Sequence, residues 1–315
     1  MTQQLNTSEL DFNKIKDNLK DFMRSQSDLN DYDFEGSNLS ILLDAMAYIT
    51  HYQGVYVNAA VNESFLDTAI RRNSIISHAK SIGYTPNSTK AAQATINLKF
   101  NEAENDANNI IGVTIAKGAK FIGSYQGSIY NFVTFDTYST SYPYSIDIPI
   151  KQGSYHTKTF TWLDGTVQNF ILNESDIDRD SISLKVNGVF WTYSNGDLTN
   201  VDASSQVFYI QENYDNKTEL YFGPDSGLFG LRPNNGDTLE VDYIRSDGAA
   251  ANGVDVFSIP GLVGGYDAQG ISISLVDVAS LGMDPEDIED VRFRAPKNYE
   301  RQDRAVSADD FKAIL

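Results

Sequence analysis

The spacing of apolar residues changes near Ala91, and this change limits the fold more than any other feature of the sequence. Before it, apolar residues recur every three or four positions, which is the spacing of one face of an α-helix. From Ala94 to Phe100 they alternate with polar residues, as in a β-strand. Helices that precede a run of strands indicate an α+β chain. We expect a helical N-terminal region over residues 1–90 and a central, antiparallel β-rich region over residues 91–280.

Three helices are expected in the first region. The first has an apolar stripe made of Phe12, Ile15, Leu19 and Phe22. Thr7 or Ser8 is a candidate for its N-cap. The last helix spans about residues 66–82, because Gly83 suits the left-handed position after a helix and Pro86 prevents its continuation.

The middle helix is the longest and begins at Ser37 or Asn38. Its apolar residues follow alternating steps of three and four, a heptad seam with one polar member: Leu39, Leu42, Met46, Ile49, Gln53, Tyr56 and Ala60. Two interpretations remain open. The seam packs on the helix of residues 66–82 in the same chain, or it forms an interface with another chain.

The β-rich region is interrupted often by pairs of residues that favour tight turns, such as Lys117-Gly118, Asn187-Gly188 and Asp247-Gly248. Such pairs connect short antiparallel strands. Residues 281–315 form a third, helical segment. Asp284 and Pro285 predict a helix that ends before Pro296. Residues 307–310 (SADD) resemble a capping box near the end of the sequence, so we expect a truncated C-terminal part.

Charge and composition exclude several classes of function. The 43 acidic and 24 basic residues give a formal net charge of −19, which disfavours a nucleic-acid partner. The sequence contains no stretch of about 18 apolar residues, so no membrane span is expected. The absence of Cys excludes disulfides, thiolate metal sites and a Cys nucleophile.

The residues that most often carry catalysis or bind metals form no convincing site. His51, His78 and His156 are isolated from one another in the sequence and lack a metal-binding spacing. Asp176, Asp178 and Asp180 resemble half of a calcium loop, but Ser181 and Asn187 stand where it needs Gly and Glu. We expect no enzymatic activity, no catalytic residue, no cofactor and no bound metal.

One glycine-rich segment has a specific pattern. Residues 220–236 read LYFGPDSGLFGLRPNNG, after the strand pair of residues 186–191 (VNGVFW) and before the exit at residues 248–253 (GAAANG). We interpret five of its residues as structural turn positions: Gly223, Gly227, Gly230, Pro233 and Gly236.

Three further segments extend the pattern over nearly the whole chain. They are residues 34–44 (FEGSNLSILLD), residues 78–86 (HAKSIGYTP) and the RAP…RAVS…DF series at residues 294–311. In order and spacing, the chain resembles the baseplate wedge subunits of T-even-like contractile-tailed phages, within the baseplate J-like family.

The resemblance implies a structural protein of the virion, located in the tail baseplate and assembled in the bacterial host cytoplasm. It implies an inner ring built by self-association, as a homodimer and with ring neighbours. It also implies contacts with other wedge proteins and with sheath- or hub-proximal proteins, and a part in tail assembly and in the triggering of contraction. Two alternatives are a carbohydrate-binding or adhesin module, suggested by the Tyr-rich β region, and a tail-associated glycosidase with two carboxylates in a cleft.

Overall fold

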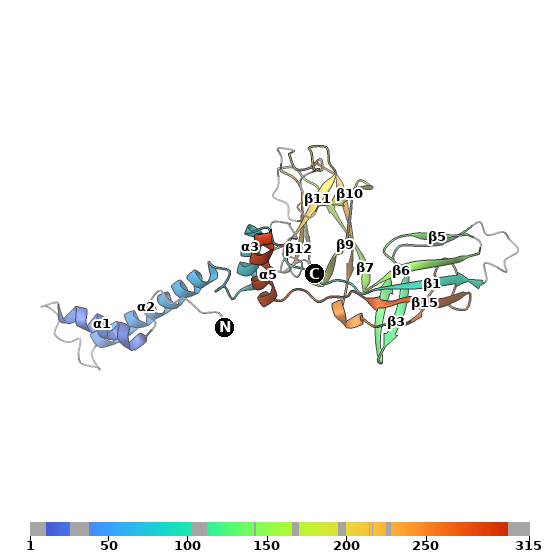
Figure 1. Cartoon of the computed structure of the whole chain (residues 1–315). Helices are drawn as coiled ribbons and strands as arrows, with labels where there is room; N and C mark the ends of the chain where they lie inside the picture. Colours follow the sequence, from blue (N-terminus) through green and yellow to red (C-terminus); the bar gives the residue numbers. More distant parts are fainter. Residues whose placement is uncertain are drawn as a thin grey trace. The chain divides into compact units, whose positions relative to one another are not determined.

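The computed structural model describes residues 11–25, 38–101, 112–141, 143–165, 170–194, 200–213, 215, 217–224 and 228–301. Its contacts divide the chain into two compact units, Met1–Thr85 with Asp287–Leu315, and Pro86–Glu286. The first unit is helical and the second is rich in antiparallel strands, so the expected α+β class is confirmed (Figure 1). The domain boundaries proposed at residues 90 and 280 stay predictions.

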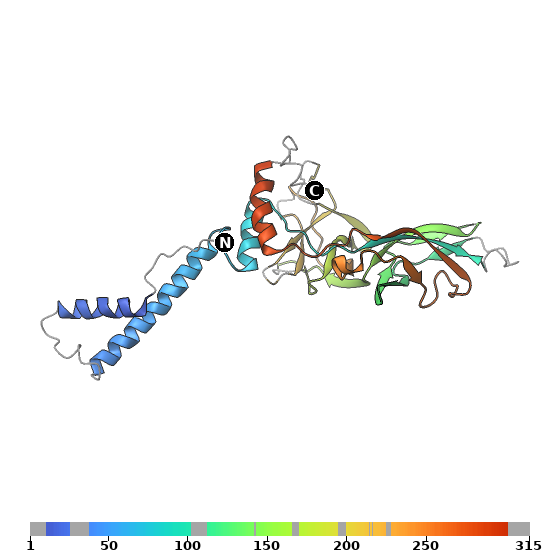
Figure 2. The ribbon, with the colours of Figure 1, turned by 60° about the horizontal axis from the view of Figure 1, so that its bottom comes forward.

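The helical unit contains α1 (Phe12–Arg24), α2 (Asn38–Glu63), α3 (Arg72–Ser81) and α5 (Ile288–Arg301). The helices pack in two pairs, α1 with α2 and α3 with α5, and both views place the members of each pair together (Figures 1 and 2). The core of the second pair consists of Ala69, Ile75, Ala79, Val291 and Ala295.

Three helix starts differ from the sequence-based expectation, those of α1, α3 and α5. Asp11 caps α1, because its carboxylate accepts the backbone N–H groups of Asn13 at 2.9 Å and Lys14 at 3.2 Å. The proposed caps Thr7 and Ser8 lie outside the described residues, as does the capping box at residues 307–310.

The expected helix over residues 66–82 begins later, at Arg72. The Glu63 carboxylate explains the delay. It accepts the backbone N–H groups of Ile70 at 3.0 Å and Arg71 at 3.2 Å, so these donors are satisfied outside a helix. At the other end, Gly83 has a φ of +78°, as expected for the residue after a helix.

The prediction for the last helix was wrong at both ends. Asp284 does not cap it, because its side chain accepts the backbone N–H of Ala249 at 3.1 Å. The helix begins after Asp287, whose carbonyl accepts the N–H of Val291 at 3.0 Å, and it continues through Pro296. An internal proline costs about 3 kcal/mol. Full burial of Val291 and Ala295 in the core with α3 offsets that cost.

The β unit contains two large sheets. The first comprises β1 (Gln93–Phe100), β3 (Lys120–Tyr125), β4 (Ser128–Val133), β6 (Ser145–Gln152), β14 (Val256–Ser258) and β15 (Ile271–Ser280). Its order is β14-β3-β4-β6-β1-β15 and its pairings are antiparallel. A small two-stranded antiparallel sheet of β2 (Val113–Ile115) and β5 (Tyr138–Thr140) contributes to its core, as does the 3₁₀ helix η1 (Gly248–Ala251).

The second sheet has seven strands. They are β7 (Ser154–Thr161), β8 (Phe170–Leu172), β9 (Ile177–Val186), β10 (Val189–Tyr193), β11 (Val207–Glu212), β12 (Thr218–Tyr221) and β13 (Thr238–Arg245). The order is β7-β13-β9-β10-β11-β12-β8, with β10 and β11 parallel and the other pairs antiparallel. The predicted Asn187-Gly188 turn joins β9 to β10, with φ angles of +50° and +80° that match a hairpin turn.

All seven strands of the second sheet lie between β6 and β14 in the sequence, so this sheet is an insertion into the first. Polar side chains fix the junction. Lys117 Nζ lies 2.7 Å from the buried Asp242 carboxylate, which also accepts a hydrogen bond from the Thr157 hydroxyl at 2.6 Å. Gln152 Nε2 donates to Asp247 at 2.7 Å.

Candidate assembly surfaces

Helix α2 buries the face that carries its smaller side chains. This small-residue face consists of Ser40, Leu43, Ala47, Gly54, Asn58 and Asn62. Ile15 of α1 is buried, and Lys16 Nζ lies 2.5 Å from an Asp44 carboxylate oxygen of α2. Small side chains permit the close approach of two helix backbones, so this face suits the contact with α1.

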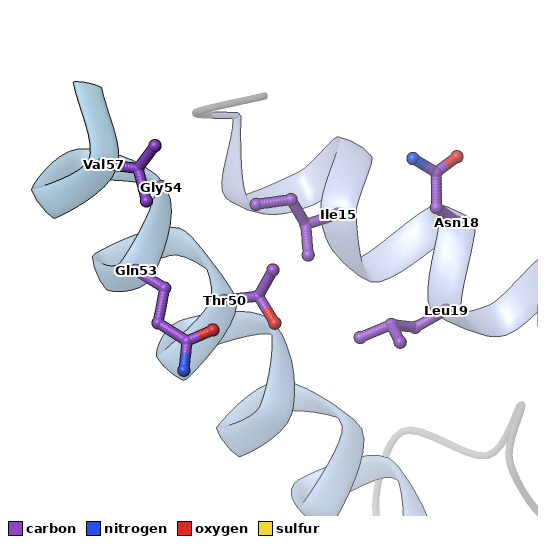
Figure 3. Close-up of a pocket in the computed structure, with 7 residues that line it drawn as sticks. All are labelled: Ile15, Asn18, Leu19, Thr50, Gln53, Gly54 and Val57. Atoms are coloured by element: carbon purple, nitrogen blue, oxygen red, sulfur yellow. The ribbon is translucent and has the colours of Figure 1, made fainter. Parts of the chain in front are cut away.

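A groove of about 480 Å³ follows the contact between α1 and α2 (Figure 3). Its lining is mostly apolar, with two amide side chains: Ile15, Asn18, Leu19, Thr50, Gln53, Gly54 and Val57. The groove carries no carboxylate, so it does not provide the pair of acids that the glycosidase alternative requires.

The heptad seam of α2 is open to solvent. Leu42, Met46, Ile49 and Tyr56 are exposed by 55, 47, 56 and 69%. Gln53 and Ala60 are also exposed, and Leu39 is partly exposed. The alternative in which the seam packs on residues 66–82 is therefore wrong, because α3 packs on α5 and leaves these side chains uncovered.

A second apolar stripe runs along α2, and the sequence analysis missed it. This tyrosine stripe consists of Ile41, Tyr48, Tyr52 and Val55, exposed by 60, 55, 43 and 40%. The rings of Tyr48 and Tyr52 make an edge contact with centroids 4.7 Å apart. The steps of seven, four and three residues between its members were the signal that could have revealed it.

The three faces of α2 are spread around its axis. At about 100° per residue, the tyrosine stripe lies roughly 120° from the heptad seam, and the small-residue face lies roughly 140° from the seam on the other side. Intramolecular packing thus covers about a third of the helix, and two apolar faces remain.

The glycine-rich turn is held by close packing and hydrogen bonds. Gly230 and Gly236 have φ angles of +100° and +88°, a region that favours glycine. A Cβ on Gly223 would collide with the Phe229 carbonyl. That carbonyl accepts the Tyr209 hydroxyl at 3.1 Å. Pro233 is buried before the turn that leads into β13, and Gly227 lies outside the described residues.

The acidic triplet in β9 and just before it is used for ion pairs. Asp176 binds Arg245 at 2.9 Å, the buried Asp178 lies 3.4 Å from Lys151, and Asp180 lies 3.0 Å from Lys90. The three carboxylates therefore serve three different cations. Across the described ranges, no group of three or more His, Asp or Glu side chains is arranged to hold a metal ion.

The three histidines lie in separate environments. His78 Nε2 is 2.9 Å from the Glu63 carbonyl, where it helps hold the segment between α2 and α3. His156 Nε2 lies 2.9 Å from the Ser154 hydroxyl and its ring stacks on Tyr243. His51 makes an edge contact with Tyr52 on α2. None of these contacts pairs a nucleophile with a base and an orienting acid.

Comparison with known proteins assigns the chain to a family. The family described as "Baseplate wedge protein gp6-like, helical domain" matches residues 11–84. The family described as "Bacteriophage baseplate wedge protein gp6, third domain" matches residues 157–245. The chain is also 32% identical over 330 residues to "Baseplate wedge protein gp6" of Enterobacteria phage T4, which covers 96% of this chain. The chain belongs to the gp6-like baseplate wedge family.

The two family matches follow the architecture of this gp6-like chain. The helical-domain match contains α1, α2 and α3, and the third-domain match coincides with the inserted seven-stranded sheet. The chain spans about half the length of the T4 relative, 49%. Family membership identifies it as a component of the tail baseplate, and hence of the virion. No helix in the described ranges is both long and apolar enough to cross a membrane.

Proposed function

We propose that the chain is a structural subunit of the baseplate ring and that α2 joins it to its neighbours. The heptad seam faces a second copy of the chain, and the tyrosine stripe faces a helix of a different wedge protein. Contacts with ring neighbours and with sheath- or hub-proximal proteins complete the assembly. The ring takes part in tail assembly and in the triggering of contraction, and it needs neither catalysis nor a cofactor.

One observation carries this proposal: two of the three faces of α2 are apolar and exposed. Soluble monomers rarely expose continuous apolar patches larger than a few hundred Å². Burial of one large apolar side chain contributes roughly 1.5–3 kcal/mol. A stripe that includes Leu42, Met46 and Ile49 therefore favours association strongly.

The chemistry of the two faces supports different partners. The seam has strict heptad spacing, which suits a helix of the same sequence, and Gln53 is a polar member that can set the register. The tyrosine stripe has bulky side chains with polar ends. Such side chains are typical of interfaces where an apolar ring is buried and its hydroxyl stays hydrated. We therefore assign the like partner to the seam.

The test is the double variant Leu42→Asp/Met46→Asp. Two carboxylates in the seam would be buried without partners, so self-association through α2 should weaken at least 100-fold in sedimentation equilibrium. The melting temperature of the β unit should stay unchanged, because these side chains are exposed in the single chain. The matched control is Ile129→Asp/Leu262→Asp, which places the same charges at two side chains exposed by 73% on the β unit.

The control variant should associate like the wild type. A seam variant that associates normally would contradict the role of the seam. The pair Tyr48→Ala/Tyr52→Ala examines the other face, and it should keep self-association while losing copurification with a second wedge protein. If Tyr48→Ala/Tyr52→Ala lost both self-association and copurification, the assignment of two different partners would be contradicted.

A further inference from the structure

Strand β15 is an edge strand of the six-stranded sheet. On its inner side it pairs with β1. Elsewhere in the described chain, its backbone hydrogen bonds are confined to Ala279, whose N–H donates to Val254 at 3.0 Å and whose carbonyl accepts from Gly253 at 2.7 Å. A register shift opposite Thr95 separates this end from the regular part of the strand. Residues 271–275 therefore form a regular strand segment whose outer edge is not paired by any part of the chain that the structure describes.

These five residues, Ile-Ser-Ile-Ser-Leu, alternate strictly. Ile273 lies opposite Leu98 and Leu275 opposite Ile96, so both share the face of the buried core. Ser272 and Ser274 are exposed on the opposite face. Ile273 is only partly buried and Leu275 is 39% exposed. The hydrophobic core of this sheet is thus incompletely covered at its β15 edge.

The other edges of the two sheets are protected in ways that β15 is not. Strands β14 and β8 have three residues each, and β7 carries Lys158 and His156. Short edges and edge lysines are devices that prevent pairing with another chain. In β15 the one charged residue is Asp277, which lies beyond the regular segment.

We propose that residues 271–275 of β15 pair antiparallel with the same residues of a second copy, about a twofold axis at Ile273. In this register Ile273 lies opposite its own copy, Ile271 opposite Leu275, and Ser272 opposite Ser274. Apolar residues meet apolar residues on the core face and serines meet serines on the outer face. A twofold axis perpendicular to the sheet keeps each residue on its own face, as such pairing requires.

The second copy is the occupant that this pattern favours, because the segment reads the same in both directions at the level of apolar and polar residues. No like charges oppose one another in this register. The pairing joins two six-stranded sheets into one continuous sheet and covers Leu275. It is independent of the α2 surface, which lies in the helical unit.

The absence of native Cys permits a direct test. Ser272→Cys/Ser274→Cys places thiols opposite each other in the proposed register, so mild oxidation with diamide should yield a covalent dimer as the main product. Each single variant should remain monomeric on a non-reducing gel, because its thiol faces a serine. The experiment is performed in the full chain and repeated with Leu42→Asp/Met46→Asp, which separates it from association through α2.

The matched control is Ser258→Cys, an exposed serine on the opposite edge strand. It should give no more dimer than chance collision, at least tenfold less than the double variant. The proposal is overturned if the double variant stays monomeric, if Ser258→Cys cross-links equally, or if Ser274→Cys cross-links alone, which would indicate a different register. Ile273→Cys alone should cross-link, because this residue lies opposite its own copy at the axis. Adding Ser274→Lys should abolish that cross-link and leave the melting temperature of the Ile273→Cys chain unchanged.

Discussion

The α1–α2 pair and the inserted seven-stranded sheet use apolar residues in opposite ways. The sheet buries its large side chains, among them Trp162, Trp191 and Phe208, in one core. Helix α2 buries Ser40, Ala47 and Gly54 and leaves its leucines, isoleucines and tyrosines mostly outside. The sheet is therefore stabilised within the chain, whereas α2 has the composition of a core helix whose core includes other chains. Stability and assembly should respond to different substitutions.

The largest expected effect is a loss of stability of the inserted sheet that substitutions on α2 do not cause. Phe208→Ala should lower the free energy of unfolding of the sheet by about 3–5 kcal/mol, because Phe208 is 1% exposed and its truncation leaves a cavity. Tryptophan fluorescence during urea unfolding measures this selectively, since both tryptophans lie in this core. Tyr56→Ala on α2 is the control and should change the same transition by less than about 0.5 kcal/mol. Equal effects would contradict the comparison.

The polar junction between the two sheets should give the next largest effect. Asp242→Asn removes the charge that binds Lys117, and we expect a loss of about 2–3 kcal/mol at pH 7. Burial alone would raise the pKa of Asp242, but hydrogen bonds from Lys117, Thr157 and Tyr155 outweigh it and lower that pKa. This stabilisation is complete above the unfolded pKa of about 4 and is lost as the pH falls through the lower folded value.

Asp178 provides the contrast. Burial raises its pKa, the nearby Lys151 lowers it, and Asp180 adds to the increase, with a net rise. Ionisation of Asp178 therefore destabilises the folded chain as the pH rises from the pKa of the unfolded state toward the higher pKa of the folded state. Asp178→Asn should therefore cost less than Asp242→Asn at pH 7, and the difference should shrink toward pH 3. Denaturant titrations at several pH values measure both, and an equal cost for the two variants would refute the assignment.

The smallest expected effect concerns the contact of α1 with α2. Ala47→Leu inserts a large side chain on the fully buried part of the small-residue face and should cost about 1–3 kcal/mol. Hydrogen exchange of the α1 amides should accelerate accordingly. The control, Ala45→Leu, lies at an exposed position of the same helix and should leave α1 protected. Protection of α1 in both variants would show that the small-residue face does not set this contact.

Sequence periodicity predicted the helical and strand-rich regions, the long helix and its seam, because these depend on local spacing. It did not predict which face α1 would cover. Hydrophobicity directed attention to Leu42 and Ile49, whereas the contact selects side chains small enough for close approach, such as Ala47 and Gly54. The tyrosine stripe was missed because its members lie in a second register beside the first.

Other errors arose where distant residues decide the local structure. Pro296 was expected to end a helix, but packing against α3 maintains the helix through it. Asp284 was predicted to cap this helix, but its carboxylate instead accepts the backbone N–H of Ala249 in η1. The insertion of one sheet into another depends on pairing between β1 and β15, which no local pattern encodes.

That insertion has a consequence for synthesis on the ribosome. Strand β1 is made early, but its partner β15 is made only after the whole seven-stranded sheet, since Gln93 pairs with Ser280. At about 5–20 residues per second, the delay is on the order of ten seconds or more. The inserted sheet can close from its own contiguous residues during that time, while β1 waits with Ile96 and Leu98 uncovered on one side. A nascent chain of this architecture therefore completes its later-encoded sheet before its earlier one, and premature release would expose the edge of β1.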